Sequence, residues 1–272
     1  MYDYGARNYD PALGRWMNID PLAERYNSYS SYNYCVNNPV VYIDPDGQKV
    51  IWGEGLSDEQ KMEIGYQITQ LRRNSSTFNK IFEALHSSEN EFSINGAGFS
   101  SIGMDAVVLP NSPIEILGSD EKTFELITKE GKPGASLIFY FGTMKEDNLS
   151  LNDLIPEEFS HLYQNLFYVG EKSFDYDKKP DGVNIEFEAK LVAGIIKKEA
   201  NISLLDKRAE STLKPHGYAE RLGIKYLNGR GMNNYTSDMR NWINLPTLSD
   251  AYKNKKVDYS RLPSMLISLM TK

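Results

Sequence analysis

The sequence is poor in cysteine and histidine, and it has no long hydrophobic run. Its 272 residues include one cysteine, Cys35, and three histidines. A single cysteine excludes an internal disulfide framework and a zinc site of the CxxC type. No stretch approaches the roughly 18 apolar residues of a membrane helix, so we expect no membrane span. The first ten residues, MYDYGARNYD, lack a basic region and an apolar core, and so predict no secretory signal peptide.

Positive charge is scarce as well. The chain has 30 Lys and Arg against 37 Asp and Glu, a net charge of −7. Binding to nucleic acid needs clustered basic side chains that meet the phosphates. The basic clusters here are short, and we interpret each as the solvated face of a helix: Arg72-Arg73, Lys197-Lys198 and residues 253–256. We therefore expect no nucleic-acid partner, and a nuclease is the weaker alternative.

Several common catalytic motifs are missing too. The sequence has no G-x-S-x-G nucleophile motif, and the glycine-rich GRGMNN at 229–234 lacks the Lys-Ser/Thr ending of a phosphate-binding loop. The acidic stretch at 174–184 lacks the ligand spacing of a calcium-binding EF-hand. These absences leave acid–base and metal chemistry as the main possibilities.

What is present begins at the N-terminus. Residues 2–47 are crowded with Tyr, Asp, Asn and turn-forming Pro and Gly, with little helical periodicity. Five successive pieces of this stretch closely resemble the end of the RHS-repeat-associated core, which closes the YD-repeat shell of large bacterial toxin-delivery proteins. The pieces are YDYGARNYDP (2–11), GRWMNIDPLAE (14–24), SYSSYNY (28–34), NNPV (37–40) and IDPDG (43–47).

This resemblance implies a two-part organisation. In that family the DPDG-like end marks the start of a variable C-terminal domain, which is usually the toxic cargo. We therefore expect residues 1–47 to be the end of the core and residues 48–272 to be a cargo domain of a polymorphic toxin. The resemblance also implies secretion, or delivery to a target cell, as part of a larger RHS protein. A cognate immunity protein is the expected partner.

The cargo region predicts an α+β fold, with helices first, then strands, then helices. Ser57 and Gln60 fit a capping box at the start of an amphipathic helix. Short apolar runs then predict strands whose spacing favours a small antiparallel sheet. The expected strands are 92–95, 106–110, 114–117, 124–128 and 136–141. The expected helices after the first are 77–86, 151–169, 184–200, 203–213, 217–227, 236–243 and 257–270.

The segment EEFSHLYQ at 157–164 carries the candidate chemistry. On a helix, residues four apart face the same way, so Glu157 and His161 project side by side, with Glu158 adjacent. This layout resembles the zincin helix H-E-x-x-H, in which two His bind zinc and the Glu activates water. Here Glu157 takes the place of the first His.

The flanking segments extend the resemblance to a degenerate zincin-like metallopeptidase domain over roughly residues 75–200. In zincins a strand precedes this helix and forms the edge of the cleft, and 136–141 is the candidate. In gluzincin-like members a later helix supplies a Glu ligand followed by a small residue, which Glu186 and Ala189 match. Glu188 fits less well because it points to another helix face.

The resemblance implies roles for four residues. Glu157, His161 and Glu186 would be metal ligands and Glu158 the general base of a metal-dependent peptidase or related hydrolase, with a protein substrate. Zinc accepts carboxylate oxygen as well as imidazole nitrogen, but two carboxylates shift the preference toward harder metals such as manganese or calcium. The alternative is a zincin-like fold with a dead site that binds no metal and serves as a binding module.

Simpler interpretations stand beside these. A Glu pair after Pro156 is what a helix N-terminus favours, and His161 can be an ordinary partly buried histidine. His86 is expected near a helix C-terminus, and nothing places His216 in the cleft. Gln164, one turn from His161, is expected to orient its ring.

Overall fold

The computed structural model describes residues 2–3, 8–19, 30–32, 51–88, 90–100, 104–110, 134–169, 182–204, 215–245, 257–260 and 262–271. Contacts divide the chain into two units. One comprises Met1–Ile51 with Ser57–Thr69, and the other Trp52–Leu56 with Gln70–Lys272. Among the described residues, no helix combines the length and hydrophobicity needed to cross a membrane. The boundary expected after Gly47 stays a prediction.

The first unit contains a three-stranded antiparallel sheet of very short strands. Its strands are β1 (Tyr2–Asp3), β2 (Asn8–Asp10) and β3 (Arg15–Trp16). The turn between β2 and β3 is closed by the amide of Gly14, which donates to the Asp10 carbonyl at 2.8 Å. Gly14 has φ +63°, a conformation that costs glycine little. Trp16 is buried and meets the ring of Tyr9 edge-on, which gives this small sheet an aromatic anchor.

Helix α1 (Asp58–Asn74) begins as its capping box predicts. The Ser57 hydroxyl accepts from the Gln60 amide at 3.2 Å, and the Gln60 side chain accepts from the Ser57 amide at 2.9 Å. Two backbone donors at the start of the helix are thereby satisfied. Ile64, Ile68 and Leu71 form its buried stripe.

The second unit contains a four-stranded sheet with the order β4-β5-β7-β6. Its strands are β4 (Ile51–Trp52), β5 (Glu91–Ala97), β6 (Ala106–Pro110) and β7 (Gly134–Tyr140). β7 runs parallel to β5 and antiparallel to β6. The helices and sheets confirm the α+β class, but the expectation of an antiparallel sheet is wrong for the β5–β7 pair. The strands expected at 114–117 and 124–128 lie outside the described residues.

Burial explains why β7 lies inside the sheet. From Ala135 to Tyr140 every residue is buried, so both faces of the strand are covered, as in the interior of a mixed or parallel sheet. In β6, Val107, Val108 and Leu109 are only half-buried, which suits a terminal strand. The terminal strands of the described sheet are β4 and β6. The expectation that the strand at 136–141 forms the edge of a cleft stays a prediction.

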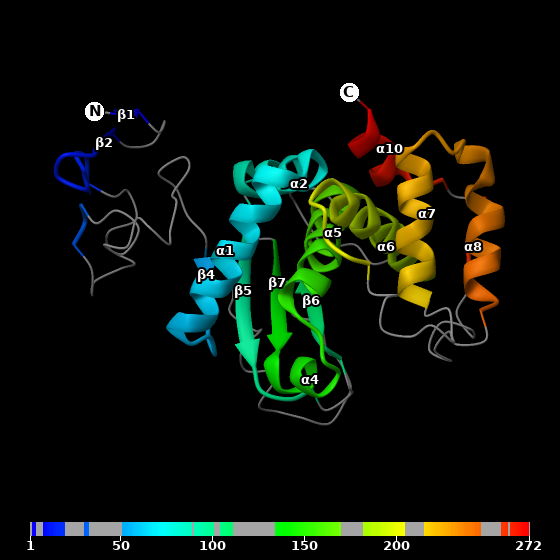
Figure 1. The fold of residues 1–272 in the computed structure, drawn as a ribbon, viewed down its shortest axis with the longest axis horizontal. Coiled ribbons are helices and arrows are strands. Elements are labelled where there is room, and N and C mark those ends of the chain that lie inside the picture. Colours follow the sequence, from blue (N-terminus) through cyan, green and yellow to red (C-terminus); the bar gives the residue numbers. More distant parts are fainter. Residues whose placement is uncertain are drawn as a thin grey trace. The chain divides into compact units, whose positions relative to one another are not determined.

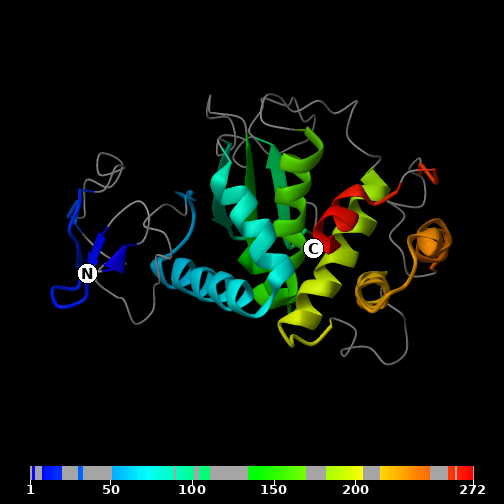
Figure 2. The ribbon, with the colours of Figure 1, turned by 90° about the horizontal axis from the view of Figure 1, so that it is seen from above.

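The helices pack as successive layers beside this sheet (Figures 1 and 2). α5 contacts β6 and β7 and, on another side, α6, which in turn contacts α7. α2 packs on α5 and α6. The bounds of the helices that follow α1 are α2 (Ser76–Ser87), α4 (Phe141–Glu146), α5 (Leu151–Val169), α6 (Gly182–Glu199), α7 (Pro215–Leu227), η5 (Met232–Asn234), α8 (Tyr235–Ile243) and α10 (Ser264–Met270).

Most predicted helices are confirmed, and two expectations are not. The helix expected at 257–270 spans only α10, because Pro263 occupies its N-cap position and residues 257–260 are non-helical. Of the helix expected at 203–213, residues 203–204 are non-helical and the remainder lies outside the described residues.

Helices α6 and α7 meet at very short range. A Cβ atom added to Gly194 would lie 2.1 Å from the carbonyl oxygen of Glu220, and one added to Gly223 would lie 2.0 Å from that of Leu191. The two glycines therefore let the helix backbones touch. Lys197 of α6 and Glu220 of α7 form an ion pair at this contact, and both side chains are fully buried. The interpretation of Lys197 as part of a solvated face is thus wrong, whereas Lys198 beside it is exposed.

The end of α6 also holds the beginning of α2. The Glu199 carboxylate accepts from the Ser75 hydroxyl at 2.5 Å and from the Thr77 amide at 3.0 Å. Ser75 itself caps α2 by accepting from the Phe78 amide at 3.0 Å. A carboxylate at a helix N-terminus is favoured by the helix dipole. This contact links the two helices and fixes α6 at its C-terminal end.

Candidate metal centre on helices α5 and α6

Helix α5 begins well before the EEFSH segment. The amide and hydroxyl of Ser150 both donate to the Asp153 carboxylate, at 2.8 and 2.7 Å, and this local cap starts the helix at Leu151. Pro156 is therefore inside the helix, and Glu157 and Glu158 lie beyond its first turn. The helix-terminus explanation of the Glu pair is wrong for this reason. Both side chains are instead buried in the interior of the second unit.

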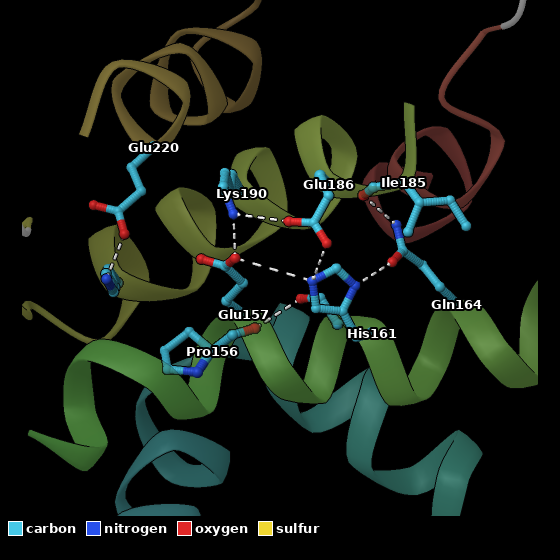
Figure 3. Close-up of polar contacts among 10 residues, drawn as sticks. Pro156, Glu157, His161, Gln164, Ile185, Glu186, Lys190 and Glu220 are labelled. Atoms are coloured by element: carbon cyan, nitrogen blue, oxygen red, sulfur yellow. Dashed lines mark hydrogen bonds and ion pairs between the residues drawn. The ribbon is translucent and has the colours of Figure 1, made fainter. Parts of the chain in front are cut away.

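Three predicted ligands converge between α5 and α6 (Figure 3). His161 Nε2 lies 3.9 Å from Glu157 Oε1 and 3.6 Å from Glu186 Oε1. One potential ligand atom from each of the three residues lies within 4.8 Å of the other two. The i, i+4 spacing on α5 explains the first pair, and the packing of α6 on α5 brings Glu186 to them.

A chain of hydrogen bonds orients the His161 ring. Gln164 donates its amide Nε2 to the Ile185 carbonyl at 2.9 Å, which leaves its Oε1 as an acceptor facing His161 Nδ1 at 2.9 Å. Nδ1 must therefore carry the proton, and the lone pair of a neutral ring lies on Nε2, toward the two carboxylates. Metal-binding histidines are oriented by the same kind of second hydrogen bond. The contact of Gln164 with His161 confirms the expectation from their spacing.

Lys190 belongs to this site although the sequence motif did not indicate it. Its ammonium group contacts Glu157 Oε1 and lies 3.1 Å from Glu186 Oε2. The side chain is 2% exposed, so the charge is held inside the protein. Lys190 follows Glu186 by four residues on α6, and this spacing is the sequence signal that would have suggested the pair.

The environment of Glu158 differs from that of its neighbour. Burial raises the pKa of its carboxyl well above 4.5, and the nearby carboxylates of Glu157 and Glu186 raise it further. Lys190 opposes this shift and Asp105, just before β6, adds to it. Burial and the neighbouring carboxylates thus make Glu158 easier to protonate, and a stronger base once ionised, than an exposed glutamate.

Glu186 is shifted in the opposite direction. Burial alone would raise its pKa, but the interactions of its carboxylate with Lys190 and His161 outweigh burial and hold the pKa below 4.5. Glu188, two residues on, faces elsewhere, as expected. It accepts from the Tyr168 hydroxyl at 2.6 Å, from Gln164 Nε2 at 3.3 Å and from the Leu266 amide at 3.1 Å. Glu188 therefore stabilises the packing around the site.

The donor atoms suit a divalent cation, although an ammonium already contacts two of the three residues. Ligands around a tetrahedral zinc ion lie roughly 3.3–3.6 Å apart, from metal–ligand distances of about 2.0–2.2 Å. The 3.6 and 3.9 Å separations measured from His161 Nε2 need only small side-chain shifts to reach that range. The competing feature is Lys190, which binds the same Glu157 oxygen.

Of the other two histidines, His86 has a described side chain, and it lies away from the candidate ligands. His86 lies in the last turn of α2, as expected, where it stacks on Phe82 with ring centroids 5.9 Å apart. His216 is the second residue of α7, and its side chain lies outside what the structure describes. Tyr163 packs against Phe167. The roles of Glu157, Glu158, His161 and Glu186 in metal binding and catalysis stay predictions.

Part of the chain is similar to known proteins. Salivary gland surface protein 1 of Aedes aegypti is 52% identical over 48 residues, which are 18% of this chain and 1% of that protein. Toxin subunit YenC1 of Yersinia entomophaga is 36% identical over 63 residues, 23% of this chain and 6% of that protein. The chain thus spans only a small part of the length of either relative.

No protein-family model and no solved structure matches the chain. The zincin-like fold therefore stays a prediction. The matches of 48 and 63 residues are too short to cover most of residues 48–272, so they give that region no relative along its length. What the comparisons do show is that part of this chain is related in sequence to a subunit of a bacterial toxin.

Proposed function

We propose that residues 48–272 are the effector domain of an RHS-type toxin and that its site is a metal-dependent hydrolase centre of the peptidase type. The convergence of Glu157, His161 and Glu186 carries this proposal, because one ligand atom from each lies within 4.8 Å of the others. The partial similarity to a toxin subunit and the RHS-like pieces in residues 2–47 support the effector role.

Each residue of the site has a part in this proposal. His161, fixed by Gln164, presents Nε2 to the site, and the carboxylates of Glu157 and Glu186 supply oxygen ligands. A bound divalent ion would activate a water molecule and polarise a carbonyl group. Glu158 would accept the proton of that water, from a position beside the ligands on α5.

The position of β6 favours an extended peptide as substrate. β6 is a terminal strand of the described sheet, and helix α5, which carries Glu158, packs against it. Terminal strands bind extended peptides through their backbone groups.

Growth inhibition tests the proposal. The full chain is produced in the cytoplasm of a bacterial test strain, beside Glu158→Gln and the control Glu146→Gln, an exposed acid of α4. We expect the wild type and the control to inhibit growth and Glu158→Gln to lose inhibition at equal protein level and with an unchanged circular dichroism spectrum. Inhibition that survives in Glu158→Gln would refute the hydrolase assignment.

One observation favours a second candidate function. Lys190 already pairs with both Glu157 and Glu186 and offsets one of their two negative charges, where a divalent ion would offset both. A domain in which Lys190 keeps this place has a catalytically inactive site and acts as a binding module of the toxin. In that case chelators and Glu158→Gln leave its biological effect unchanged, and the purified wild type carries no stoichiometric metal.

A further inference from the structure

Lys190, the buried lysine of the site, contacts two of the residues that are predicted to bind a metal. Lys190 Nζ contacts both carboxylates that would bind a metal, and it shares Glu157 Oε1 with that prospective ion. Its side chain is 2% exposed, so the ammonium group is held away from water beside the two carboxylates. The cation position beside these carboxylates therefore has a resident occupant.

We propose that Lys190 is an internal cation that competes with divalent metal for Glu157 and Glu186, and that its replacement by a neutral side chain opens a metal site of one imidazole and two carboxylates. The inference rests on the site of the proposed function but not on its activity. It assigns to Lys190 the control of metal affinity, a role that none of the zincin-like features in the sequence implies.

The charges explain the competition. Two positive groups that share a carboxylate oxygen lie close to each other, and their repulsion is much stronger in a protein interior than in water. When Lys190 is replaced by a neutral residue, Glu157 and Glu186 lose a positive charge that both of them contact in a mostly buried place. Loss of a cation from a buried site is costly, so a divalent ion gains in affinity for the two carboxylates. His161, already oriented by Gln164, completes the ligand set with only small side-chain shifts.

The experiment compares metal binding by the wild type and by Lys190→Met in the full 272-residue chain. Methionine keeps the length and apolar stem of lysine and removes only the charge. Zinc and manganese are titrated by calorimetry, and bound metal is counted by mass spectrometry after gel filtration. We expect Lys190→Met to bind zinc at least about tenfold more tightly than the wild type. The thermal unfolding midpoint of Lys190→Met should also rise when zinc is added.

Three control variants make the comparison specific. Lys198→Met removes an exposed charge from the same helix and should leave metal affinity unchanged. Lys190→Arg keeps a cation beside the carboxylates and should remain as weak a binder as the wild type. The double variant Lys190→Met/His161→Ala lacks one ligand and should lose the gain in affinity.

The outcomes separate this inference from the proposed function. Zinc in Lys190→Met but none in the wild type supports the inference and refutes a metal-dependent activity of the natural chain. Weak binding by the wild type and tight binding by the variant supports both. Equal affinities, or no binding by Lys190→Met in excess zinc, overturn the inference. A variant that stays unfolded even with zinc overturns it too, because the metal should then replace the lost charge.

Discussion

The buried ion pair between α6 and α7 allows a quantitative prediction. Lys197 and Glu220 are both 0% exposed and contact each other directly. Lys197→Met therefore leaves the carboxylate of Glu220 without this partner inside the protein. Removal of one member of a buried pair costs about 3–5 kcal/mol, because the remaining charge stays desolvated. We expect a loss of this size in the free energy of unfolding.

The double variant measures the coupling. Lys197→Met/Glu220→Leu removes both charges, and such replacements are often neutral or even stabilising by about 1–4 kcal/mol. We therefore expect the double variant to be more stable than either single variant. The helix contact itself should persist, because Gly194 and Gly223 set the distance between the backbones.

Urea unfolding of the full chain, followed by far-UV circular dichroism, gives these free energies. Lys198→Met is the matched control, since it removes the neighbouring exposed lysine and should change stability by less than about 0.5 kcal/mol. The reasoning is refuted if Lys197→Met costs less than about 1 kcal/mol. It is refuted equally if the losses of the two single variants simply add in the double variant.

Two further predictions concern the same helices. Gly223→Ala places a Cβ atom 2.0 Å from the backbone oxygen of Leu191, so the helices must separate, and we expect a loss of about 1–3 kcal/mol in urea unfolding. Gly98→Ala, which meets nothing within 4 Å, is its control and should show almost no loss. For pH, burial and a hydrogen bond to Asp238 raise the pKa of Tyr226 above its usual 10.0, so the unfolded chain ionises first. Ionisation of Tyr226 should leave the free energy of unfolding unchanged below about pH 10 and lower it as the pH rises above that value. The fall should be less steep in Tyr226→Phe, and equal slopes in the two proteins would contradict this.

Local patterns predicted the elements of this chain well where one face of an element had to be buried. The helix expected at 151–169 has the observed bounds of α5, and the strand expected at 106–110 has those of β6. The order of strands was not predictable in the same way. Periodicity indicates that a segment is a strand, but not which neighbour it pairs with or in which direction. The parallel pairing of β5 with β7 depends on contacts across the fold.

The candidate site, like the fold, could be predicted only where the signal lies within one helix. Spacing on one helix predicted that Glu157 and His161 project together, and the structure brings Glu186 within 3.6 Å of the imidazole. The burial of Lys190 and Lys197 was not predicted, because lysine on a helix is usually solvated. Each is buried with a partner from another helix, 33 and 23 residues away in the sequence. Only the packing of whole helices reveals such pairs.

The contacts of α10 have a consequence for the order of folding. Its amide at Leu266 donates to Glu188 at 3.1 Å, and Lys80 donates to the carbonyl of Leu269 at 3.0 Å, so both ends of this short helix are held by charged side chains. Glu188 is two residues from the candidate ligand Glu186, but its α10 partner lies 78 residues further along the chain. During synthesis, Glu188 on α6 cannot accept the hydrogen bond from the Leu266 amide until α10 has been made. The contact of α10 with Glu188 therefore forms only after residues 264–270 have been made, later than α5 and α6 themselves.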